Sequence, residues 1–266
     1  MIKGDGNILA GLDRGTILSA YGGEAGANDF LSPQSSTALA ANAFGPFLNA
    51  PDALPPLPGL DDFGWPARQV RPKTVLPLPW RGGRHPCLDL VIVTGDAVIG
   101  VASRRYEPFR LKGRASLSVA YRRPVWGSQM SGFESVRDHL DDGSLAFQHL
   151  DAASLVKQGL ALMNAARSSG LRPALVYLYA EPDAWPEGAP IEREPIERHR
   201  QEIAFFAHRV RGDTVGFVAC SYRELLAGWG ADARPEIRGH AAALREHFRY
   251  SASEPLWRSD DVTAPA

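Results

Sequence analysis

Apolar and polar positions between residues 87 and 104 follow the pattern of two short strands. The first run, CLDLVIV (87–93), is apolar apart from Asp89, and the second, AVIGVASR (97–104), ends in Arg104. The Gly-Asp pair between the runs is typical of a two-residue hairpin turn. Counting outward from this turn places Asp89 opposite Ala102 and diagonal to Arg104, on one face of the hairpin.

The rest of the chain alternates between helical and strand-like patterns. Capping residues, helically spaced apolar faces and Gly or Pro stops predict helices over residues 35–45, 131–141, 147–168, 193–210, 221–230 and 236–250. Continuous apolar runs predict buried strands at 173–180 and 214–220, and the Pro- and Gly-rich stretch 51–72 predicts a long loop. This order predicts one α/β domain with a mixed sheet, in which an antiparallel hairpin precedes crossover strands.

Domain boundaries follow from where the periodicity stops. Residues 1–30 are expected to form a flexible N-terminal extension, residues 31–250 the domain, and residues 251–266 a C-terminal tail.

With 44% hydrophobic and 22% charged residues, the chain has the composition of a soluble globular protein. No apolar run is long enough to span a membrane, and no signal peptide is recognisable. The two cysteines, Cys87 and Cys220, are interpreted as small core residues in a reducing compartment, which predicts a cytoplasmic location.

Positive charge is concentrated in one segment. Seven bases and one acid lie between residues 104 and 123, a local charge of +6 in a chain whose net charge is −1. Such a segment is either a contact surface for phosphates or a solvated loop. The bases are Arg104, Arg105, Arg110, Lys112, Arg114, Arg122 and Arg123.

Two substitutions would turn this face of the hairpin into a site suited to metal-dependent phosphodiester hydrolysis. A glutamate at 102 beside Asp89 would supply oxygen ligands for Mg²⁺, which lowers the pKa of bound water and polarises a phosphodiester. A lysine at 104 would orient the attacking water. This chain has Ala102 and Arg104 at those places.

The layout resembles the PD-(D/E)xK, or restriction-endonuclease-like, superfamily, and is similar to a bacterial family within it. Four stretches carry the resemblance in the same order, across about residues 30–230: SSTALAANAFG (35–45), CLDLVI (87–92), VASRRYEPF (101–109) and DAASLVKQGL (151–160). The resemblance implies an αβββαβ core with a further strand near 73–78. It also implies Mg²⁺-dependent DNA hydrolysis, Asp89 as a metal ligand, and Asp89, Arg104 and Lys157 at catalytic positions.

The departures from the family pattern weaken the expectation of catalysis. Ala102 replaces the family glutamate, Arg104 replaces the lysine, and Ser154 stands at the glutamine position of the helix. Alanine cannot ligate a metal, and arginine stays protonated, although it can hold a phosphate through two hydrogen bonds. Activity is therefore expected to be impaired or lost. The alternatives are an inactive DNA-binding or protein-interaction module, or a structural α/β protein.

Several residues are candidates for contacts at this site. Candidate substrate contacts are Ser36 and Asn42 from the first helix and Arg105, Arg110, Lys112 and Arg114 from the basic segment. Each functional candidate also has a structural interpretation: a salt bridge between Asp89 and Arg104, a polar helix stripe that includes Lys157, and a helix cap for Ser36.

Another carboxylate would be needed to restore a metal site. Glu107, Glu24, Glu134 and Glu181 are the candidates. If the second strand continued straight, Glu107 would point to the opposite face from Asp89, whereas a bend before Pro108 would redirect it.

Overall fold

The structure is a mixed five-stranded sheet with helices on both faces, as expected. The computed structural model describes residues 7–21, 30, 32–113, 116–127 and 129–248. The strands lie in the order β1-β2-β3-β4-β5; β1, β2 and β3 are antiparallel, whereas β3, β4 and β5 are parallel. Their bounds are β1 (Gln69–Val75), β2 (Cys87–Val93), β3 (Ala97–Arg104), β4 (Arg172–Tyr179) and β5 (Gly216–Ser221).

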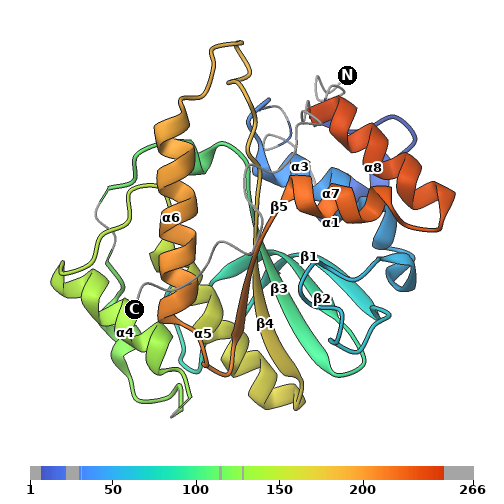
Figure 1. Ribbon diagram of the computed structural model, residues 1–266. Coiled ribbons are helices and arrows are strands. Elements are labelled where there is room, and N and C mark those ends of the chain that lie inside the picture. The colour runs from blue at the N-terminus through green and yellow to red at the C-terminus, as the bar shows by residue number, and fades with distance from the viewer. Residues whose placement is uncertain (1–6, 22–29, 31, 114–115, 128, 249–266) are drawn as a thin grey trace, which may run out of the picture.

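The helices form one layer on each face of the sheet (Figure 1). One layer holds α1 (Arg14–Ala20), α3 (Ser36–Phe44), α7 (Tyr222–Gly230) and α8 (Pro235–Phe248), and the other α4 (Ser131–Asp142), α5 (Ala152–Ser169) and α6 (Arg193–Arg209). Strand β3 separates the two cores, because Val98 and Ala102 join the cluster around α5 while Ile99 and Val101 join the cluster around α3 and α7. Among these elements, α3, β1, β2, β3, α5 and β4 occur in the expected αβββαβ order.

Two element boundaries differ from the predictions for identifiable reasons. Helix α5 begins at Ala152 and not near 147, because the backbone amides of Gln148, His149 and Leu150 donate to the carboxylate of Glu202. A segment that donates its amides to a side chain cannot use them in a helix. Strand β1 begins at Gln69, inside the stretch predicted to be a loop, because its residues pair with β2.

Part of the segment expected to be a flexible extension packs on the domain. Helix α1 places Ile17 and Tyr21 in a buried cluster with Ala38 and Ala41 of α3. Residues 249–266, which include the predicted tail, lie outside the described residues.

Two further sequence expectations concern the cysteines and the membrane. Cys220 is buried as expected, but Cys87 is exposed at the start of β2, so its interpretation as a core residue was wrong. Within the described ranges, the search for a helix of sufficient length and hydropathy to cross a bilayer finds none.

Candidate functional site

Asp89 lies where β2 separates from β3. The pairs Val93–Val98 and Leu90–Val101 confirm the predicted hairpin register, and Leu90–Val101 is the last pair of the ladder in the described structure. Beyond this pair, a side chain replaces the backbone acceptor: Oδ2 of Asp89 accepts a hydrogen bond from the backbone N–H of Ser103 at 2.8 Å. Asp89 is therefore held at the open end of the hairpin by backbone as well as by side chains.

Two cations neutralise the Asp89 carboxylate. Arg104 Nη1 lies 3.0 Å from Oδ2 and Lys73 Nζ lies 3.8 Å from Oδ1. The three side chains are 15% (Asp89), 19% (Arg104) and 30% (Lys73) exposed, so water screens these pairs only in part. The salt bridge between Asp89 and Arg104 is the structural interpretation that the sequence allowed.

Lys73 is a site residue that the sequence analysis missed. It stands on β1 between Pro72 and Thr74, which pair with Leu90 and Leu88, so it lies across from Asp89. Its backbone has φ 43°, a conformation uncommon for a residue with a side chain. Its ammonium group also donates to Thr37 Oγ1 at 2.8 Å, which ties β1 to the start of α3.

Glu107 is redirected toward the same end of the sheet. Strand β3 ends at Arg104, and a 3₁₀ turn (Glu107–Phe109) follows. The carboxylate accepts hydrogen bonds from Ser36 Oγ at 2.7 Å and from the backbone amides of Arg105 and Tyr106 at 3.0 and 3.1 Å. Burial raises the pKa of Glu107, but the Ser36 and amide hydrogen bonds and the charge of Arg104 outweigh it and lower the pKa overall.

Arg104 is ion-paired with Asp89 and is also influenced by the charge of Glu107. Burial lowers the pKa of its guanidinium, but the charges of Asp89 and Glu107 and other nearby groups more than compensate and raise it. A permanently charged side chain occupies the region where the family resemblance expects a metal and a lysine.

The donor set does not fit Mg²⁺. Ala102 is completely buried in the core and offers no ligand, and the oxygens of Asp89 and Glu107 already accept from cations, amides and a hydroxyl. Over the described ranges, no group of three or more His, Cys, Asp or Glu side chains is arranged to hold a metal ion.

The other carboxylates proposed as replacements have their own partners. Glu134 pairs with Arg137 within α4 at 3.2 Å, and Glu181 forms a two-hydrogen-bond pair with Arg200 of α6. Glu24 lies outside the described residues. Glu107 is thus the candidate whose charge acts on Arg104.

Three of the predicted substrate contacts have structural roles. Asn42 is completely buried and bonds to the backbone of Leu9 and Ala38. Arg105 is buried, donates to the Pro33 carbonyl at 2.6 Å, and lies over the Phe248 ring. Ser36 links Glu107 to the Arg105 amide, whereas its neighbour Ser35 is the helix cap.

The remaining basic candidates differ in whether they have hydrogen-bonding or ring partners in the described structure. Arg110 donates to Gln34 and lies over Trp185. Lys157 is half-buried on α5 and has neither a hydrogen bond nor an ion pair with the described residues; the adjacent Gln158 donates to the Cys87 carbonyl at 3.0 Å. Arg114 lies outside the described residues.

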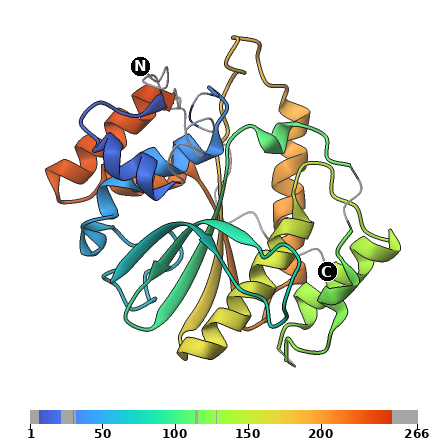
Figure 2. The same ribbon diagram turned by 180° about the vertical axis from the view of Figure 1, so that it is seen from behind.

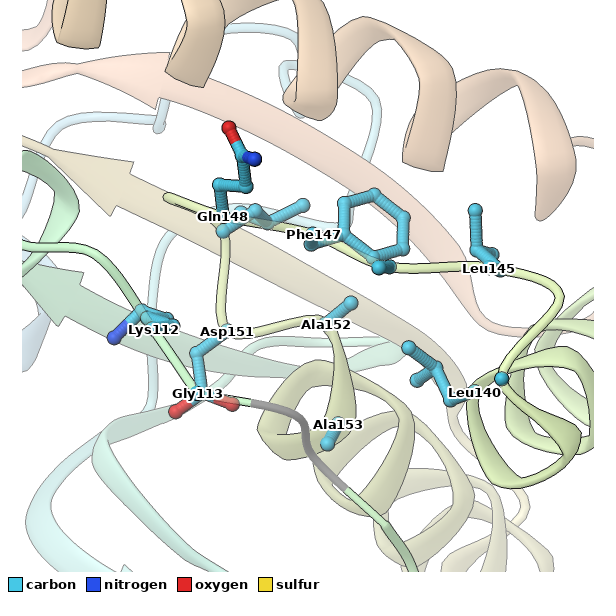
Figure 3. A pocket seen from close by; sticks show the side chains of 12 residues that line it. Lys112, Gly113, Leu140, Leu145, Phe147, Gln148, Asp151, Ala152 and Ala153 are labelled. Carbon is cyan, nitrogen blue, oxygen red and sulfur yellow. The ribbon is translucent and has the colours of Figure 1, made fainter.

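Lys112 borders a pocket of about 240 Å³ at the start of α5. Figure 3 shows Lys112 and Asp151 on one side of this pocket and Leu140 and Leu145 on the other. Asp151 also caps α5 by accepting from the Ser154 amide at 3.0 Å. The pocket thus has a mixed lining in which apolar side chains predominate, with one cationic and one anionic group at its edge.

A second basic run, free of acidic residues, lies elsewhere in the sequence. Residues 63–88 contain five bases and no Asp or Glu: Arg68, Arg71, Lys73, Arg81 and Arg84. Arg81 and Arg84 are exposed in the turn between β1 and β2, and neither forms a hydrogen bond or ion pair within the described chain. A count of acids against bases could have found this run.

Comparisons with known proteins identify no relative, so any function must be inferred from the fold and from this geometry. No family model matches the chain, and no curated protein or solved structure matches it either.

Proposed function

We propose that the protein is a catalytically silent relative of PD-(D/E)xK nucleases that binds DNA without cutting it. The observation that carries the proposal is the neutralisation of Asp89 by Arg104 and Lys73, at 3.0 and 3.8 Å, where the family chemistry requires an unpaired carboxylate. The αβββαβ order and the position of Asp89 at the end of the hairpin support the relationship.

Electrostatics opposes a divalent ion at this place. Two unit charges 4 Å apart in a partly screened environment interact by about 4 kcal/mol. A divalent ion carries two charges, so at the same distance it would meet about twice this repulsion from each of Lys73 and Arg104. It would gain nothing from Ala102, which has no oxygen ligand.

The same cations suit a phosphate. Arginine can donate two parallel hydrogen bonds to phosphate oxygens, and lysine supplies a compact positive charge. Lys73 and Arg104 keep part of their surface exposed, and the acid-free run from residue 63 to 88 extends the positive surface along β1. This charge distribution favours DNA over an uncharged protein surface as the partner.

Calorimetry and a cleavage assay test the catalytic half of the proposal. We expect the protein to bind neither Mg²⁺ nor Mn²⁺ and to leave plasmid DNA intact with either ion. The double variant Ala102→Glu, Arg104→Lys restores the family residues and should gain metal binding. Because position 102 is buried, circular dichroism must first establish that the variant folds. Cleavage by the parent protein that disappears in Asp89→Ala would overturn this half.

Fluorescence anisotropy with a labelled duplex tests the binding half. We expect sequence-tolerant binding with a Kd on the order of 10⁻⁶ to 10⁻⁴ M near physiological salt, tightening steeply as salt is lowered. An unchanged anisotropy at low salt and high protein concentration would refute DNA binding.

A further inference from the structure

We propose that the turn between β1 and β2 is the element that contacts DNA, with Arg81 and Arg84 on the phosphates and Arg123 beside them. We refer to residues 76–86, which join β1 to β2, as the hairpin tip. It is separate from the β2–β3 hairpin that carries Asp89. The inference rests on the proposed function, because it names the surface through which DNA would be bound.

The hairpin tip is fixed to the domain at its base. Leu76 N–H donates to the Pro86 carbonyl at 2.9 Å, and Leu78 N–H donates to His85 Nδ1 at 3.1 Å. The side chains of Leu76 and Leu78 are buried in the core around α5. Asn164 of α5 adds a hydrogen bond to the Pro77 carbonyl at 2.9 Å, and Figure 2 shows the turn beside this helix.

Trp80 anchors the end of the tip. Its ring centroid lies 5.4 Å from that of Tyr121 and 5.5 Å from that of Trp126, in edge-to-face contacts. The guanidinium of Arg123 lies 5.3 Å from the Trp80 ring centroid. Trp80 therefore attaches the tip to the 119–126 segment and places a third arginine next to it.

The two tip arginines are presented to solvent. Gly82 and Gly83 between them have φ 81° and 78°, a conformation that favours glycine and reverses the chain sharply. Arg81 and Arg84 are both exposed, and in the described structure neither has an acidic or hydrogen-bonding partner. Arginines on a fixed turn lose less conformational freedom on binding a phosphate than arginines on a mobile segment.

Protection of the sheet edge does not account for the tip. Strand β1 is an edge strand, where charged residues and proline prevent pairing with other chains, and this explains Arg71 and Pro72. The tip lies beyond Val75–Cys87, the outermost pair of the ladder in the described chain, so it presents no strand edge to protect.

Charge and polarity select nucleic acid as the partner. A membrane-binding loop needs exposed apolar side chains as well as bases. In the tip, Leu76 and Leu78 are buried and the half-buried Trp80 packs on two aromatic rings. The exposed side chains are those of Arg81 and Arg84, with Pro77, Pro79 and the adjoining Val75. The exposed guanidinium groups suit the DNA backbone, whose phosphates are regularly spaced.

A matched pair of double variants tests the inference. Arg81→Ser, Arg84→Ser removes two charges from the tip, and Arg193→Ser, Arg211→Ser removes two exposed charges near α6. Binding to a labelled 20-base-pair duplex is measured by anisotropy over a salt series. We expect the tip variant to bind at least tenfold more weakly and to reduce the salt slope by about 1.8, and the α6 variant to change affinity by less than about twofold. Equal circular dichroism spectra and thermal unfolding of all three proteins establish that they fold alike.

The outcomes separate this inference from the proposed function. If the parent does not bind the duplex, the proposed function fails and the tip inference fails with it. If the parent binds and the two double variants weaken binding equally, DNA binding stands and the tip inference is wrong. Tip-dependent binding to phosphatidylserine vesicles as strong as to the duplex would also overturn it.

Discussion

At the residue scale, His199 of α6 is a buried neutral group whose pKa is strongly lowered. It is completely buried, its Nε2 lies 2.9 Å from the hydroxyl of Tyr177, and its Nδ1 has no partner among the described residues. Burial, with a smaller contribution from His149, lowers the pKa of His199 from 6.5 to about 3. The ring is neutral in the folded protein under conditions in which the unfolded chain already binds a proton.

The first prediction concerns the pH dependence of stability. Between pH 6.5 and about 3, the unfolded chain binds a proton at His199 that the folded protein does not, so stability falls as pH falls. The maximum slope from this residue is about 1.4 kcal/mol per pH unit. We expect His199→Gln to reduce the loss of unfolding free energy between pH 6 and 4, measured by urea denaturation. The exposed His208→Gln on the same helix serves as control; equal slopes in all three proteins would contradict the prediction.

The sequence predicts part of the charged cluster but not all of it. Counting from the turn placed Arg104 near Asp89 because strand pairing has a fixed period, and the salt bridge follows. Lys73 was not predictable in this way, since its position depends on how β1 pairs with β2 and on its positive φ. Local pattern defines contacts within a hairpin, whereas contacts from a third strand require the folded sheet.

At the element scale, α4 and α5 approach closely through a glycine. A methyl group on Gly159 of α5 would overlap the ring of Phe133 on α4. Both residues are buried in the core around α5. A glycine that weakens the helix is therefore favourable here, because it allows the two helices to pack.

The second prediction follows from this contact. In an open helix interior, Gly→Ala stabilises by about 1 kcal/mol. We expect Gly159→Ala to destabilise by about 1–3 kcal/mol instead, since the ring of Phe133 must move. Gly239→Ala on α8, where a methyl group meets no atom within 4 Å in the described structure, should stabilise by about 0.5–1 kcal/mol. Urea denaturation of both variants provides the measurement, and a stabilised Gly159→Ala would refute the packing argument.

Element types were predictable, and the exceptions lie where distant side chains intervene. Capping signals identified α3 and α7. Ser35, and not its neighbour Ser36, caps α3, and Ser221 caps α7. The late start of α5 depends on Glu202, more than fifty residues away. The turn that redirects Glu107 depends equally on Ser36. The late start of α5 has no signal in the local sequence, whereas Pro108 did indicate that a bend could redirect Glu107.

At the scale of the whole molecule, β3 and β4 lie between the two cores and contribute side chains to both. Seven of the eight residues of β3 and seven of the eight of β4 are buried, whereas in β1 only Val70 is buried. Continuous apolar runs predicted the buried strands but not their order, so β5 was expected to be as buried as β4. It lies at the edge of the sheet, and only its last two residues are buried.

The third prediction uses this difference between central and edge strands. Backbone amides exchange with solvent through local opening where few apolar contacts hold a strand, and through global unfolding where both faces are buried. We expect peptides from β3 and β4 to exchange at the rate of global unfolding, and peptides from β1 to exchange at least tenfold faster, by hydrogen exchange and mass spectrometry.

Bound DNA should slow exchange in the hairpin tip (76–86) more than in β5, if the tip is the contact surface. Equal protection of β1 and β3 in the free protein would mean that β1 and β2 separate only with unfolding of the whole domain. It would contradict the expectation that the edge strand β1 opens locally.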